Sequence, residues 1–190
     1  MSTIEQKRNM GRAIVNFEAR RDKNGNLAVY RMPAGDGGGE YEVAGINNGY
    51  HPGKARQLRN LIEAGQHEQA EREAADYIVE YTASAGAWLA GMGAGPEFYL
   101  RDTCFNAGPG GAARVLQMAV GTAVDGKVGP KTLDALYRYF RQHGSRGLLD
   151  ALHVARWDYM EEKTFRPSKK QFWKGWQNRM NNALKVAATI

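Results

Sequence analysis

The sequence contains very little cysteine and histidine, and this scarcity excludes several kinds of site. Cys104 is the only cysteine among the 190 residues, so an intramolecular disulfide framework is excluded. The four histidines and Cys104 show none of the spacings that are typical of a zinc site. Cys104 lies in an apolar stretch, and free cysteines are usually buried. We therefore expect a buried structural thiol rather than a nucleophile.

Long apolar runs are also missing. No run approaches the roughly 20 residues that a bilayer-spanning helix requires, so we expect no stable membrane insertion. The segment Met1–Arg8 is polar and lacks the apolar core of a secretory signal. We therefore expect synthesis in the cytoplasm without a signal peptide. A protein of this kind that acts outside the cytoplasm would need a separate route of release.

The charge of the chain is positive. The formal net charge is +6 and the isoelectric point is about 9.5. A basic surface favours polyanions in general, which include nucleic acid, anionic lipid and the bacterial wall. The aromatic and basic residues form no recognised nucleic-acid motif, so we expect no nucleic-acid partner.

Helical patterns dominate the chain. Ser2 and Glu5 have the spacing of a capping box, and Met10, Ile14 and Phe17 then recur at helical spacing. This pattern predicts a helix that ends near Glu18. Helical patterns return from Pro52 onward. Gly108-Pro109 predicts a break, Gly129-Pro130 predicts a helix start, and residues 145–164 and 168–187 predict two long helices.

The segment between the first two helical patterns differs. Residues 21–26 have turn chemistry, with Asn24-Gly25 able to adopt positive φ at low cost. Leu27–Arg31 and Tyr41–Val43 predict short strands, and a glycine-rich stretch separates them. We therefore expect a mainly α fold with a small β-hairpin lobe at about residues 18–47.

Glu18 is a candidate catalytic acid. Cleavage of a glycosidic bond requires a carboxylic acid that protonates the leaving oxygen, and a second group that activates water or stabilises the developing cation. Glu18 follows Phe17 at a predicted helix end, where an apolar neighbour and the helix dipole both favour the protonated form. The alternative is a surface glutamate that pairs with Arg20 or Arg21.

The N-terminal half resembles a known family. Phe17-Glu18, a hairpin, Asp36–Gly39 and Tyr41–Ile46 follow one another in the order seen at the start of family 108 glycoside hydrolases. Those N-acetylmuramidases carry a Glu-Gly-Gly-Tyr motif at a helix end, followed by Asp-x-Gly-Gly and a Thr-x-x-Gly-Ile strand. The resemblance implies a lysozyme-like fold, in which Glu18 matches the catalytic glutamate.

The C-terminal half resembles the peptidoglycan-binding region that is usually attached to these muramidases. Phe105–Gln117 is similar to an Asn-Ser-Gly-Pro helix start, and Val124–Thr132 is similar to a Val-Asp-Gly-x-x-Gly-Pro-x-Thr turn. Phe172–Arg179 is similar to the closing Lys-Gly-Trp-x-x-Arg helix. The resemblance implies a catalytic region over residues 1–95 and a helical peptidoglycan-binding region over 96–190, packed into the same globule.

The sequence departs from the family pattern around the second catalytic group. Ala19-Arg20-Arg21 replaces the Gly-Gly-Tyr that follows the family's glutamate, and Glu42 occupies the place of the family's threonine. Asp36 reaches its family position only if one residue is gapped. Glu42 and Asp36 are therefore equal candidates for the second group, with Glu40 behind them. Retention and inversion of configuration both stay open.

Four further residues are candidates for substrate contact. Tyr41 and Tyr50 belong to the lobe or follow it, Asn106 lies in the motif before Gly108, and Trp176 lies in the C-terminal motif. His51 is interpreted as a helix-capping or surface histidine. Lys174 and Arg179 are expected to be solvated charges on a helix face.

The residues and the resemblance together predict a lysozyme-type muramidase. It would hydrolyse the β-1,4 bond between N-acetylmuramic acid and N-acetylglucosamine in peptidoglycan glycan strands, with Glu18 as the general acid and no cofactor. The alternative is a non-catalytic peptidoglycan-binding module. We expect action in the periplasm or cell wall, either as an endolysin released by a holin or as an antibacterial effector from a secretion system. An effector would have a cognate immunity or inhibitor protein.

Overall fold

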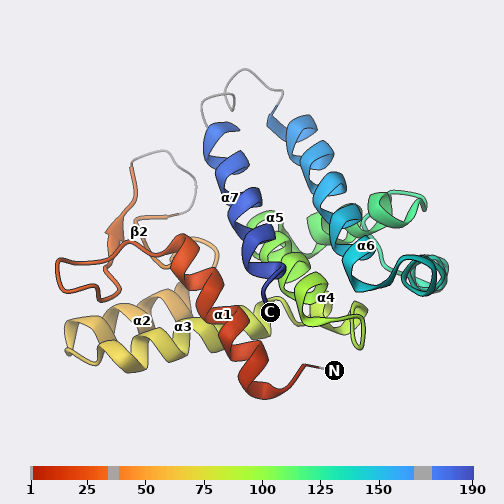
Figure 1. The fold of residues 1–190 in the computed structure, drawn as a ribbon. Helices are drawn as coiled ribbons and strands as arrows, with labels where there is room; N and C mark the ends of the chain where they lie inside the picture. Colours follow the sequence, from red (N-terminus) through yellow and green to blue (C-terminus); the bar gives the residue numbers. More distant parts are fainter. Residues whose placement is uncertain (1, 34–38, 165–172) are drawn as a thin grey trace. The chain divides into compact units, whose positions relative to one another are not determined.

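The fold is mainly α and lysozyme-like in class, as predicted, with seven described helices and one small three-stranded sheet (Figure 1). The computed structural model describes residues 2–33, 39–164 and 173–190. The elements are α1 (Ile4–Glu18), β1 (Tyr30–Arg31), β2 (Tyr41–Val43), β3 (Ile46–Asn47), α2 (Pro52–Glu63), α3 (His67–Tyr81), α4 (Ala83–Trp88), α5 (Ala94–Val120), α6 (Pro130–Thr164) and α7 (Trp173–Ala187).

Contacts within the chain divide it into two compact units. One unit is Ile4–Glu80, and the other combines Met1–Thr3 with Tyr81–Ile190. We call them the N-terminal unit and the C-terminal unit. This division describes contacts and does not test the functional boundary expected between residues 95 and 96, which stays a prediction.

In the N-terminal unit, α1 packs closely against α3. A Cβ added at Gly11 would lie 2.4 Å from the carbonyl oxygen of Ala75, so the two helix backbones approach each other more closely than a side chain would allow. Ile14 and Val15 are fully buried on α1, as is Ile78 on α3. Their burial explains why the apolar spacing of the sequence forms a helix here. The helix ends at Glu18, as predicted.

The lobe is a three-stranded antiparallel sheet in the order β1-β2-β3. Val43 pairs with Ile46, and both side chains are fully buried. The two residues between them, Ala44 and Gly45, have φ values of 51° and 75°. Positive φ at both central positions is typical of the tight type I′ turn, whose twist matches that of the strands it joins.

The first strand of the lobe is shorter than predicted. The sequence predicts a strand over Leu27–Arg31, whereas β1 contains only Tyr30 and Arg31. Leu27 forms an isolated bridge with Arg21 across the predicted turn instead, and its side chain is buried. The residues Leu27–Arg31 therefore take part in two separate short pairings and do not form one continuous strand.

In the C-terminal unit, α5 packs against α4, α6 and α7 (Figure 1). The predicted break occurs at Gly108, where φ is 73° and ψ is 168° inside the long α5. A similar break at Gly144 divides α6, which begins at Pro130 as predicted. Residues 168–172 of the last predicted helix lie outside the described residues, and α7 begins at Trp173.

The core of the C-terminal unit is built around α5. Its largest fully buried apolar side chains include Phe98, Leu100, Leu116, Leu136, Leu148 and Leu152. Cys104 is a free, buried thiol, as expected. No described helix combines the length and the apolar character that a membrane span requires.

Candidate active site

Glu18 is the last residue of α1. Its side chain and that of the preceding Phe17 are half-buried. The amide of Ala19 still donates to the carbonyl of Val15 at 2.8 Å, so the helical hydrogen bonding continues just past Glu18. Glu18 therefore lies at the carbonyl end of the helix, which carries a partial negative charge. The catalytic role of Glu18 is not tested by this geometry and stays a prediction.

The two arginines that follow Glu18 have partners in the N-terminal unit. Arg21 forms an ion pair with Glu71 on α3 and donates to the side chain of Asn16 at 2.6 Å. The guanidinium of Arg20 lies over the ring of Tyr30, 5.2 Å from its centroid. These contacts fasten the start of the lobe to α1 and α3.

Glu42 is held at the centre of the lobe sheet. It is opposite Tyr30 of β1 on one side and Asn47 of β3 on the other, and it is half-buried. The neighbouring Tyr41 lies under the guanidinium of Arg59 on α2, 4.8 Å from the ring centroid. Pairing on both sides fixes the backbone of Glu42, so its side chain leaves the sheet from a defined position.

The other candidate for the second catalytic group, Asp36, lies outside the described residues. The described part of the glycine-rich stretch resumes at Gly39, where φ is 102°. A Cβ at Gly39 would lie 2.3 Å from Oδ1 of Asn48. That oxygen accepts hydrogen bonds from the amides of Glu40 at 2.7 Å and Tyr41 at 3.1 Å. Glycine is therefore required at residue 39 for the lobe to close on Asn48.

Tyr50 and His51 follow the lobe and differ in exposure. The side chain of Tyr50 is 73% exposed. His51 is the N-cap residue of α2, but its side chain makes no capping hydrogen bond. Its Nδ1 instead lies 2.8 Å from the hydroxyl of Tyr77 on α3, and burial lowers the pKa of His51. His51 therefore does occupy the capping position that the sequence suggests, but its imidazole is held between α2 and α3 instead of capping the helix.

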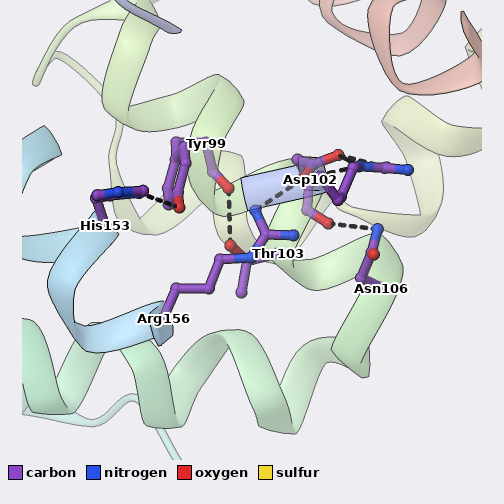
Figure 2. A network of polar contacts seen from close by, with 7 residues as sticks. Tyr99, Asp102, Thr103, Asn106, His153 and Arg156 are labelled. Atoms are coloured by element: carbon purple, nitrogen blue, oxygen red, sulfur yellow. Dashed lines mark hydrogen bonds and ion pairs between the residues drawn. The ribbon is translucent and has the colours of Figure 1, made fainter. Parts of the chain in front are cut away.

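In the C-terminal unit, Asp102 forms a buried network with Arg156 (Figure 2) and with Arg179. The carboxylate is fully buried and accepts a hydrogen bond from Arg156 at 2.7 Å and another from Arg179 at 2.6 Å. Burial by itself would raise the pKa of Asp102, but the charges and hydrogen bonds of the two arginines outweigh it and hold that pKa below its usual value.

The expectation that Arg179 is solvated is wrong. Its side chain is only 11% exposed, because a buried carboxylate needs its counterions close by. The sequence does contain a signal for this network. Arg101 and Asp102 interrupt the apolar stretch Phe98–Phe105, and a charge in such a stretch has to find a partner. Lys174, which lies on α7 with Arg179, is exposed, as expected.

A second buried ion pair joins Arg101, the residue directly before Asp102, to Glu97 on the same helix. Arg101 donates to Glu97 at 2.9 Å and to the hydroxyl of Thr82 at 3.0 Å. A Cβ at Gly86 on α4 would lie 1.9 Å from a nitrogen of this guanidinium. The glycine therefore provides the space that Arg101 occupies between α4 and α5.

A chain of aromatic residues joins α5 to the second half of α6. The indole of Trp157 donates to Nε2 of His153 at 3.1 Å, and Nδ1 of His153 lies 2.8 Å from the hydroxyl oxygen of Tyr99 (Figure 2). Because an indole only donates, Nε2 must accept, and a neutral imidazole then carries its proton on Nδ1. Burial lowers the pKa of His153 and raises the pKa of Tyr99 to about 12, so both side chains are neutral at pH 7.

Asn106 and Trp176, two of the predicted substrate contacts, belong to the C-terminal unit, whereas Glu18, Glu42, Tyr41 and Tyr50 belong to the N-terminal unit. Asn106 is half-buried and donates to the backbone carbonyl of Asp102 at 3.2 Å (Figure 2). Trp176 is half-buried on α7. Substrate contact by either residue stays a prediction. Among residues 2–33, 39–164 and 173–190, no cluster of three or more His, Cys, Asp or Glu side chains could hold a metal ion.

Comparison with known proteins links part of the chain to peptidoglycan. Residues 111–181 match the family described as "Predicted Peptidoglycan domain". A comparison with curated proteins by sequence found no significant match. The fold is similar to that of Brucella abortus SagA, with a TM-score of 0.60 and 21% sequence identity over 95% of this chain and 94% of that chain. The structural likeness shows the fold, and the family match supports a peptidoglycan-related protein.

Proposed function

We propose that the protein is a muramidase that hydrolyses the β-1,4 bond between N-acetylmuramic acid and N-acetylglucosamine. The observation that carries this proposal is the position of Glu18 at the end of α1, directly before a lobe whose central strand contains Glu42. Glycoside hydrolysis uses two carboxyl groups with different roles. The match of residues 111–181 to a peptidoglycan family indicates which polymer would supply the glycosidic bond.

Each carboxyl group has a distinct role in the proposed reaction. Glu18 protonates the oxygen of the leaving sugar as the glycosidic bond breaks. Glu42 or Asp36 then activates the attacking water or stabilises the oxocarbenium-like cation. The likeness of the Glu18 region to family 108 muramidases supports the first assignment. The replacement of the family's threonine by Glu42 is the reason to test Glu42 beside Asp36.

The test is the release of muropeptides from purified Gram-negative sacculi, analysed by mass spectrometry. The wild type is expected to release fragments with reducing N-acetylmuramic acid ends. Glu18→Gln keeps the size of the side chain but removes the acid, so the rate is expected to fall by about 10²–10⁴-fold. Glu42→Gln and Asp36→Asn, assayed in parallel, identify the second group by a comparable loss in one of them.

The matched control is Glu68→Gln. Glu68 is also a helical glutamate of the N-terminal unit, but its side chain is 95% exposed in the first turn of α3. This variant is expected to release muropeptides at the wild-type rate. Full activity in Glu18→Gln would remove Glu18 from the mechanism while keeping the enzyme.

A non-catalytic peptidoglycan-binding module is the second candidate. It is favoured by Ala19-Arg20-Arg21, which replaces the Gly-Gly-Tyr of the family motif, and by the family match, which covers only residues 111–181. This function predicts that the wild type binds sacculi and releases no reducing ends at any pH or salt concentration tested.

A further inference from the structure

The turn between α5 and α6 has a fixed shape. Gln117 is 1% exposed, and its side chain forms hydrogen bonds with residues 125–127 of the turn. Its amide nitrogen donates to Oδ1 of Asp125 at 2.7 Å and to the carbonyl of Lys127 at 3.0 Å, while its oxygen accepts from the amide of Gly126 at 2.8 Å. Arg114 adds a hydrogen bond to the carbonyl of Val124 at 2.8 Å. These bonds hold the turn in one conformation.

A pocket of about 700 Å³ opens beside this turn. Its lining includes three basic and two acidic side chains: Lys127, Lys131, Arg138, Asp125 and Asp134. All of them lie within residues 111–181, the segment that matches the peptidoglycan family. The pocket belongs to the C-terminal unit, whereas Glu18 and Glu42 belong to the N-terminal unit.

The charged side chains of the pocket differ in whether they already have a partner within the protein. Asp125 is already bound, because its carboxylate also accepts a hydrogen bond from the amide of Lys127 at 2.8 Å. Lys131, Asp134 and Arg138 are spaced at i, i+3 and i+7 on α6, so they share one face of the helix. Within the part of the chain that the structure describes, neither Lys131 nor Arg138 has an ion-pair partner. Two cations with one carboxylate between them are therefore available to a ligand.

Two backbone and side-chain features add polar groups to the same pocket. The first turn of α6 begins at Pro130 and leaves helical N–H groups without partners inside the helix. The hydroxyl oxygen of Thr122 is buried and has no hydrogen-bond partner among the described residues. Buried polar atoms usually have a hydrogen-bond partner, which for Thr122 would be a water molecule or a ligand.

The lining favours a charged peptide over a sugar. No aromatic residue is among the described residues of the pocket, so it lacks the flat rings on which sugar faces stack. A nucleic acid or a phosphate group carries only negative charge, so it would pair with the basic side chains but leave Asp134 without a partner. A ligand that carries carboxylates and an ammonium group matches both signs on this face of α6.

We infer that this pocket binds the peptide stem of peptidoglycan, with stem carboxylates at Lys131 and Arg138 and the ammonium group of the diamino acid at Asp134. The inference rests on the proposed action on peptidoglycan and adds a peptide-binding site to it. The C-terminal unit would then recognise the stem, while the bond that is cleaved lies in the glycan.

The test is calorimetric titration of the full chain with the tripeptide L-alanyl-γ-D-glutamyl-meso-diaminopimelate at low salt. The wild type is expected to bind the tripeptide, and the form with amidated carboxyl groups is expected to bind more weakly. The double variant Lys131→Gln/Arg138→Gln is expected to weaken tripeptide binding about fivefold or more, since two exposed charge pairs are lost. Arg141→Gln removes the same charge one turn further along α6, outside the pocket, and is expected to leave binding unchanged.

Asp134→Asn separates a stem peptide from a simple anion. It is expected to weaken tripeptide binding, because the ammonium group loses its partner, whereas it would strengthen binding of inorganic phosphate. Equal affinity for phosphate and tripeptide, or equal affinity of the double variant and Arg141→Gln, overturns the inference. Circular dichroism of each variant checks that the exposed substitutions leave the fold intact.

The two proposals fail separately. A wild type that binds the tripeptide but releases no reducing ends from sacculi keeps the peptide site and overturns the muramidase. A wild type that releases reducing ends but shows no heat of binding with millimolar tripeptide keeps the muramidase and overturns the peptide site.

Discussion

Arg156 and Asp102 form an ion pair of 2.7 Å in which both side chains are almost completely shielded from water, with exposures of 1% and 0%. Arg179 brings a second positive charge to the same carboxylate at 2.6 Å. The three residues come from α6, α5 and α7. The network therefore ties the three long helices of the C-terminal unit to one buried charge.

Removal of that charge is expected to destabilise the protein strongly. Asp102→Asn leaves Arg156 buried without its counterion, and loss of one partner of a buried pair costs about 3–5 kcal/mol. Urea unfolding followed by circular dichroism measures the change. Asp150→Asn is the control, because Asp150 pairs with Arg146 at the surface and an exposed pair contributes about 1 kcal/mol or less. Equal losses in the two variants would contradict the structural role of Asp102.

The same carboxylate predicts how stability depends on acid. The pKa of Asp102 is lower in the folded protein than the value of about 3.9 expected in the unfolded chain. Its contribution to stability is therefore complete above about pH 5 and is lost as the pH falls through the folded-state pKa. The free energy of unfolding, measured in urea at several pH values from 7 to 3, should fall more steeply below pH 4 for the wild type than for Asp102→Asn.

The lowered pKa values of Asp22 and Asp125 give both proteins a shared acid dependence, so only the difference between the two curves reports on Asp102. Parallel curves for wild type and Asp102→Asn would show that Asp102 titrates alike in the folded and unfolded states.

Two glycine substitutions are expected to affect stability differently, because only Gly11 lies at the close contact of α1 and α3. Gly11→Ala places a Cβ 2.4 Å from the carbonyl oxygen of Ala75, so the helices must move apart, at a cost of about 1–3 kcal/mol. Gly53→Ala on α2 meets no atom within 4 Å and should be neutral or stabilise the helix by about 0.5–1 kcal/mol. Thermal unfolding measures the difference, and only Gly11→Ala is expected to have a lower melting temperature than the wild type.

The thiol of Cys104 is expected to be unreactive in the folded protein. Burial raises the pKa of Cys104 to about 11, so the reactive thiolate is scarce at pH 8. Titration with a chromogenic disulfide reagent should show slow labelling in buffer and one rapidly labelled thiol per chain in denaturant. Fast stoichiometric labelling of the native protein would show that the environment of Cys104 is open to solvent.

Local signals in the sequence predict many element boundaries correctly. The helix that ends at Glu18 and the helix that begins at Pro130 are set by apolar spacing and by the conformational limits of proline, which act over a few residues. The strand Tyr41–Val43 is also predicted from its alternation. In each of these cases the physical cause lies within one element.

Contacts between distant residues are much harder to predict from the sequence. Asp102 lies 54 positions from Arg156 and 77 from Arg179, and no local pattern joins them. The exposure expected for Arg179 is wrong for this reason. Prediction of Glu18 as a catalytic residue depends on a family resemblance, because helix position and burial describe its surroundings without fixing its chemistry.

The two-residue turn at Ala44 and Gly45 limits how the lobe can change in evolution. An insertion of one residue between Val43 and Ile46 would have to be accommodated by a new turn or by a shift in strand pairing. A shift of one residue reverses the faces on which all side chains of a strand lie, so Glu42 would leave the sheet on the opposite side. Homologues that keep a carboxylate at this position are therefore expected to vary in length outside residues 43–46.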